Sequence, residues 1–292
     1  MEKYKVLIIL IGFIILFLVS SCEKDPGQYK PDPVLSDYEI RIRKKFDDYA
    51  MFTWSDYNRF TETLLNPRYI VLPLNEMRNT FDPSKIIIGL RHDVDLNPFK
   101  AVEMARIENS YGIRSTFFFL ATAEYFGSIN NKILAREPAM ESLLREVHNT
   151  GSEIGIHNDL LAVMINYKAD PLLFCREEIS YYRSLRIRIH GTASHGSMIA
   201  KSTVPNYNIF SDFDTAAYVE YGGDRYPVGI YSLEEFGFEY EAYKIPFNKY
   251  FSDSGGRWND PEGMQGVIKK IESSQPGDRI EILVHPDWWG KQ

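Results

Sequence analysis

The chain has 292 residues, enough for one large domain or two small ones. Hydrophobic residues make up 44% and charged residues 25%, so most of the chain should fold around an ordinary globular core. The formal net charge of −7 argues against a nucleic-acid partner, because such partners require a basic face on the protein.

The N-terminus has the pattern of a bacterial targeting signal. The basic stretch MEKYK precedes the apolar run VLIILIGFIILFLV, which is short for a membrane span, and SSC follows. The order LVSSC resembles a lipobox, which implies that residues 1–21 are a signal peptide and that Cys22 carries lipid. An uncleaved anchor helix and an ordinary secretory signal are the alternatives. Glu23 resembles the sorting pattern for the outer membrane of Gram-negative bacteria, so we expect a lipid-anchored envelope protein.

Residues 22–40 are predicted to form a tether, because EKDPGQYKPDP is charged, contains proline and lacks an apolar period. Residues 41–292 are expected to form the folded domain. The second cysteine, Cys175, lies in a helical pattern and is expected to be a buried structural residue. If Cys22 carries lipid, no disulfide framework exists.

Predicted strands and helices alternate along the rest of the chain. The helices are expected at 55–65, with Ser55 as N-cap, and at 97–112, 137–151, 170–185 and 263–278. The strands are expected at 68–73, 85–91, 115–120, 153–157, 186–191 and 279–285. This alternation predicts a parallel sheet. A closed βα barrel is favoured over an open dinucleotide-binding sheet, because no G-x-G-x-x-G follows a strand.

Histidines and aspartates gather at the expected strand ends. Five of the six histidines lie at or just past such an end, namely His92, His157, His190, His195 and His285, and Asp93 and Asp95 accompany the first of them. In βα barrels the strand C-termini form the catalytic face, where residues from several strands meet. The alternative is that strand ends merely tolerate polar residues.

Imidazoles and carboxylates together suit Zn²⁺ or a similar divalent ion. Such an ion lowers the pKa of a bound water, a carboxylate can then remove a proton, and a histidine opposite can protonate a leaving group. Asp93 and Asp95 are two residues apart, so on a regular strand they would point to the same side. Either one can therefore be the metal ligand, with the other as the base.

Four segments in this order, LRHDVD, EIGIHND, SDSGGRW and ILVHPDWW, resemble the polysaccharide deacetylase superfamily, and most closely a branch with an H-D-V-D motif. The likeness covers roughly residues 45 to 290. It implies an α/β fold, a distorted (β/α)7 barrel of the polysaccharide deacetylase type. It also implies a metal-dependent hydrolase that removes N- or O-acetyl groups from glycans.

The resemblance implies a metal site with one departure from the family pattern. Asp93 matches the catalytic base and Asp95 the first metal ligand, although Val94 separates them here. His157 matches the first histidine of the second motif, but the second histidine is replaced by Leu161. We expect His195, in the loop after the next strand, to supply the missing ligand.

The remaining family roles fall on later segments. His285 matches the general acid. The arginine that accompanies the base has no match in TASHGS, so Arg257 is expected in that role, with Asp253 and Trp258 as walls of the substrate site. Weaker candidates for substrate contacts are His92 and Trp288, and Arg91 is interpreted equally as an ion-pair partner or an anion ligand.

The function expected is the removal of acetyl groups from a cell-envelope or extracellular glycan by a divalent metal, with Zn²⁺ as the first candidate. Expected partners are the glycan and, through the lipid on Cys22, the membrane; no nucleic acid is expected, and the protein should be a monomer. The first alternative is a catalytically inactive carbohydrate-binding lipoprotein on the same barrel, favoured by Leu161. The second is another metal-dependent amidohydrolase or a glycosidase, although two carboxylates so close together are poorly placed to flank a glycosidic bond.

Overall fold

The computed structural model describes residues 33–213 and 216–291, and the expected signal peptide and Cys22 lie outside these ranges. The first described element is the helix α1, Pro33–Phe46, in which Tyr38 and Ile42 are buried. Residues 33–40, which the sequence assigned to the tether, therefore belong to a helix, and Tyr38 of this helix is buried. Within the described ranges, no helix combines the length and the apolar character needed to cross a membrane.

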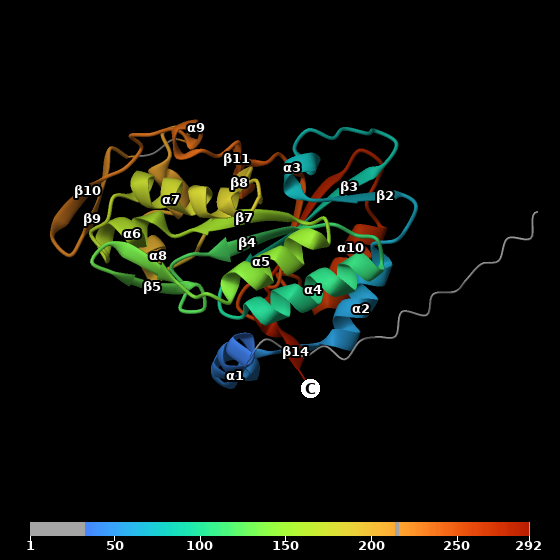
Figure 1. The fold of residues 1–292 in the computed structure, drawn as a ribbon. Coiled ribbons are helices and arrows are strands. Elements are labelled where there is room, and N and C mark those ends of the chain that lie inside the picture. The colour runs from blue at the N-terminus through green and yellow to red at the C-terminus, as the bar shows by residue number, and fades with distance from the viewer. Residues whose placement is uncertain (1–32, 214–215, 292) are drawn as a thin grey trace, which may run out of the picture.

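A curled parallel sheet forms the centre of the molecule (Figure 1). Seven strands follow one another in the spatial order β11-β8-β7-β4-β3-β13-β12, and every neighbouring pair is parallel. Their bounds are β3 Ile86–Val94, β4 Thr116–Leu120, β7 Glu153–Asn158, β8 Gly191–Ser194, β11 Tyr240–Glu241, β12 Lys249–Ser252 and β13 Arg279–Val284. The predicted parallel α/β sheet is confirmed.

The sheet is a half-barrel rather than a closed barrel. The outer strands β11 and β12 each pair on one side only, so the hydrogen-bonded ring is open between them. β2, Tyr69–Leu72, pairs with the first half of β3, and β4 pairs with the second half of the same edge. Because β13 takes the other edge of β3, the last long strand lies beside the strand that carries Asp93.

Helices cover the outside of the sheet, and short hairpins extend from it (Figure 1). The helices after α1 are α2 Trp54–Thr63, α3 Leu74–Met77, α4 Pro98–Ser110, α5 Met140–Asn149, α6 Leu160–Ile165, α7 Pro171–Ser184, α8 Met198–Ser202, α9 Leu233–Phe236 and α10 Gly263–Glu272. Short 3-10 helices are η1 Asp47–Tyr49, η2 Asn206–Ile209, η3 Ala242–Lys244 and η4 Pro286–Trp288. The remaining strands are β1 Phe52–Thr53 with β14 Trp289–Lys291, and the hairpins β5 Gly127–Asn130 with β6 Ile133–Arg136 and β9 Tyr218–Tyr221 with β10 Asp224–Pro227.

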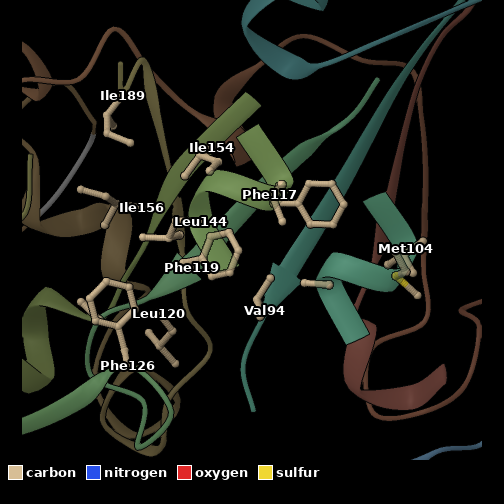
Figure 2. Close-up of a cluster of buried hydrophobic side chains, with 14 of the residues drawn as sticks. Val94, Met104, Phe117, Phe119, Leu120, Phe126, Leu144, Ile154, Ile156 and Ile189 are labelled. Carbon is tan, nitrogen blue, oxygen red and sulfur yellow. The ribbon is translucent and has the colours of Figure 1, made fainter. Parts of the chain in front are cut away.

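The main core lies between the sheet and its covering helices (Figure 2). Alternate residues of neighbouring strands, such as Phe117, Phe119 and Ile154, face Met104 of α4 and Leu144 of α5. All five are essentially inaccessible to solvent. Since burying one such side chain contributes about 1.5–3 kcal/mol, this layer fixes the strand positions on which the site depends.

Two local predictions are wrong. The N-cap of α2 is Thr53, which forms a capping box with Asp56, and Ser55 is the second residue of the helix. The segment RIRI before His190 is not a strand, and β8 begins only at Gly191. Arg186 has a φ of 63°, and this left-handed conformation interrupts an extended chain.

Candidate active site

Three side chains meet at the carboxyl ends of the parallel strands. Asp95 directly follows β3, His157 is near the end of β7, and His195 directly follows β8. One ligand atom from each lies within 4.8 Å of the others, so the group can hold a metal ion. The sequence predicted these three residues as the metal ligands.

Hydrogen bonds fix the orientation of both imidazoles. Nδ1 of His157 lies 2.8 Å from the carbonyl oxygen of Ala193, and Nδ1 of His195 lies 3.4 Å from Oδ2 of Asp159. Because both partners accept, each Nδ1 carries a proton, and in the neutral ring Nε2 presents its lone pair. The two Nε2 atoms lie 3.2 Å and 3.9 Å from Oδ1 of Asp95.

This arrangement fits a divalent cation. Oδ1 of Asp95 is buried and accepts no hydrogen bond within the described residues, although two imidazole nitrogens face it. With both imidazoles neutral, three electron-pair donors point at one another, and a cation between them relieves the repulsion. Two imidazoles and one carboxylate are a common donor set for Zn²⁺ and other transition ions, and three protein ligands leave a position for water or substrate.

His195 is oriented by Asp159, which is itself held by hydrogen bonds. Asp159, which orients His195, also accepts hydrogen bonds from Ser197 Oγ at 2.8 Å and Asn206 Nδ2 at 3.0 Å. Burial opposes ionisation of Asp159, but these bonds and His195 lower its pKa. Leu161, at the position of the missing histidine, is fully buried in α6. His195 therefore completes the cluster from another strand end, and carboxylate–histidine support of this kind is usual at metal sites.

Asp93 lies beside the cluster and is held by an arginine from its own strand. Arg91 donates to both carboxylate oxygens, Nε to Oδ1 at 2.8 Å and Nη2 to Oδ2 at 2.7 Å. Oδ2 of Asp93 is 3.6 Å from Nε2 of His157. Burial acts to raise the pKa of Asp93, but the charges of Arg91, His157 and His285 and the hydrogen bonds from Arg91 together outweigh it and keep the pKa below its usual value.

Arg91 also binds Glu281 of the neighbouring strand β13, with Nη1 3.0 Å from Oε1. Burial raises the pKa of Glu281 to about 7, despite the charge of Arg91. Asp93 is therefore the principal counterion of Arg91 at neutral pH. The expectation for Arg257 is wrong: Arg257 is exposed, and the arginine that holds Asp93 is Arg91. The spacing R-x-D on one strand was the available signal, since residues two apart share a face.

His285 follows β13 and is oriented by Asp253. Nδ1 of His285 donates to Oδ1 of Asp253 at 2.7 Å, and Nε1 of Trp289 donates to Oδ2 at 2.8 Å. Burial disfavours the charged imidazole, but the bond to Asp253 and the charges of Asp253, Asp95 and Asp93 outweigh it and raise the pKa of His285 to about 9. His285 is therefore protonated at neutral pH, with Nε2 free to donate.

Asp287 positions the chain that carries Asp95, and the sequence analysis missed it. Its carboxylate accepts from the backbone N–H groups of Asp95, Leu96 and Asn97, the shortest of these contacts being 2.7 Å. Burial and the charge of Asp95 raise the pKa of Asp287. The only signal was an aspartate two residues after His285, and a single Asp at that spacing does not predict contacts to a distant loop.

Several residues expected to contact substrate have structural positions instead. His92 lies inside β3, is fully buried and has Nε2 2.7 Å from Glu108 Oε1. Asp253 is fully buried beneath His285. Trp258 is buried, with its ring 5.5 Å from that of Phe60. Trp288 keeps a partly exposed indole.

Of the five histidines assigned to strand ends, three take part in the site. His190 precedes β8, at the opposite end of that strand, and its Nδ1 lies 2.9 Å from Glu239 Oε1.

The chain matches no family model, and a search of curated proteins finds no match.

Proposed function

We propose that the protein is a metal-dependent hydrolase that removes acyl groups, acetyl among them, from a glycan. One observation carries the proposal: a cluster of Asp95, His157 and His195 in which both Nε2 atoms face Oδ1 of Asp95. The polysaccharide deacetylase resemblance supports the same reaction. We propose Zn²⁺ as the metal, because two imidazoles and a carboxylate match its preferences.

A divalent ion in this cluster would acidify a water molecule and polarise the acyl carbonyl. The protein's own groups then have complementary roles. Asp93 is ionised at neutral pH, because Arg91 keeps its pKa low, so it can accept a proton from the attacking water. The two bonds from Arg91 also fix the carboxylate in one orientation.

His285 supplies the proton that the departing amine or alkoxide needs. Its raised pKa keeps it charged, and Asp253 directs Nε2 away from the buried side. Because β13 is the neighbour of β3, His285 and Asp93 emerge from adjacent strands at the same end of the sheet. Acid and base thus lie on elements that can flank one bound acyl group.

We also propose that the protein acts at the cell envelope, held there by lipid on Cys22. A single acyl chain binds membranes only marginally, so stable attachment requires several chains. The first described element, α1, starts eleven positions after Cys22, so the site would lie close to the membrane surface.

The test measures acid released from acetylated amino-sugar oligomers and acetylated xylan by the purified, metal-loaded protein. Asp93→Asn and His285→Gln are expected to lower kcat by about 10² to 10⁴ while metal remains bound, because each removes one proton-transfer group. His190→Ala, at the far end of β8, is the matched control and should keep the wild-type rate. No acid from either substrate class, with metal confirmed in the cluster, would favour the inactive carbohydrate-binding protein.

A further inference from the structure

A hollow of about 300 Å³ opens beside the metal cluster. Asp95 and His195 are among its lining residues. The other lining residues come from α1, from the turn after β3, from the end of β4 and from the loop after it, and they are Lys45, Phe46, Leu96, Leu120, Ala123, Glu124 and Tyr125. The hollow therefore begins where a scissile carbonyl would bind.

The polar groups in this lining already have partners. Lys45 and Glu124 form an ion pair with each other at the rim. The hydroxyl of Tyr125 donates to the carbonyl of Val94 and accepts from the N–H of Leu120, both at 2.7 Å. What remains free to contact a ligand is mostly hydrocarbon. Sugar hydroxyls would lose their hydrogen bonds to water here without replacement.

A second hollow, of about 400 Å³, lies on the other side of His195 and has a different character. Its lining includes Ser194, Lys201, Tyr207 and Tyr243. The Ser194 hydroxyl is buried without a hydrogen-bond partner among the described residues. Aromatic faces with polar groups beside them suit the hydroxyl-bearing part of a substrate.

We infer that the hollow beside Asp95 is an acyl pocket, and that the enzyme prefers acyl chains of about six to eight carbons over acetyl. The inference rests on the proposed hydrolase function. A volume of about 300 Å³ holds roughly ten groups of water size, whereas an acetyl group has three heavy atoms. Each further methylene that is buried raises affinity by about fourfold.

The experiment compares hydrolysis of N-acetyl-, N-hexanoyl- and N-octanoyl-glucosamine oligomers and the matching O-acyl esters. The expected kcat/KM rises by about 10- to 200-fold from acetyl to hexanoyl, which adds four methylenes. Ala123→Phe places a ring in the hollow and should lower the hexanoyl-to-acetyl ratio at least about tenfold. Ala135→Phe, the same substitution at an exposed position of β6, is the control and should leave the ratio unchanged.

A binding measurement gives a readout that does not depend on turnover. Calorimetry with acetohydroxamate and octanohydroxamate on the metal-loaded protein should show tighter binding of the longer chain, and Ala123→Phe should remove the difference. Acetate release with no gain from longer chains would overturn the acyl pocket and leave the hydrolase proposal intact. No acid from any substrate would overturn the hydrolase proposal, and equal affinity for the two hydroxamates would then overturn the pocket as well.

Discussion

Replacing Asp253 with Asn should lower the pKa of His285. Asp253 is fully buried, and its Oδ1 accepts from His285 Nδ1 at 2.7 Å. Asparagine has nearly the same shape and can keep one accepted hydrogen bond, but it lacks the negative charge. The substitution therefore removes the charge, and it also places the amide NH₂ of asparagine against Nε1–H of Trp289, which loses its acceptor.

The magnitude follows from the pKa of His285, which rises from its ordinary 6.5 to about 9. That difference of about 2.5 corresponds to about 3 kcal/mol at about 1.4 kcal/mol per pH unit. Asp253 is the largest contributor that raises the pKa, so its loss should lower the pKa by about 1 to 2.

The sign for stability follows from the same values. Because folding raises the pKa of His285, its stabilising contribution is complete below about pH 6.5 and is lost as the pH rises through about 9. The wild type should therefore lose up to about 3 kcal/mol of unfolding free energy across this window, and Asp253→Asn should lose much less.

Titration of the histidine ring by NMR, with His285→Gln for assignment, measures the pKa directly. Urea unfolding at pH 6, 7.5 and 9 measures the linked stability. The alkaline limb of the activity profile should move to lower pH in the variant. An identical His285 titration in the two proteins would refute the role given to Asp253.

Three further predictions concern other parts of the molecule. Arg91→Met leaves the buried carboxylates of Asp93 and Glu281 without their cation, and should lower the unfolding free energy by about 3–5 kcal/mol in urea titrations; a loss below about 1 kcal/mol would contradict this burial argument. His195→Ala should weaken Zn²⁺ binding in calorimetry by at least about tenfold; full affinity would remove His195 from the cluster. Cys22→Ala should shift the protein from the membrane to the soluble fraction, and a variant that keeps both lipid and wild-type mass would exclude lipidation at Cys22.

Much of the architecture was determined by local sequence. Continuous apolar runs such as IIIGL and TFFFL can be satisfied only in strands covered on both faces, and they form β3 and β4. Asn97 before Pro98 and Asp170 before Pro171 start their helices where the sequence predicts. The alternation of strands and helices predicts a parallel sheet. In such a sheet the polar residues that follow the strands meet at the carboxyl edge.

Tertiary structure decided which polar residues face that edge. His92 and Asp93 are adjacent in sequence, yet side chains alternate along a strand, so one enters the core against Glu108 and the other faces the site. Residue type alone cannot distinguish the two. Which of them faces the site depends on how far the strand β3 continues, and it continues to Val94.

The fold also decides which arginine binds Asp93 and which side chain is the third member of the cluster. Arg257 and Arg91 are equal candidates by residue type, and only the fold buries Arg91 against Asp93 while leaving Arg257 in solvent. His195 reaches Asp95 because the curl of the sheet brings the end of β8 toward the end of β3. Periodicity in a sequence determines which residues share a face of one element, whereas contacts between distant elements depend on the curvature and register of the whole sheet.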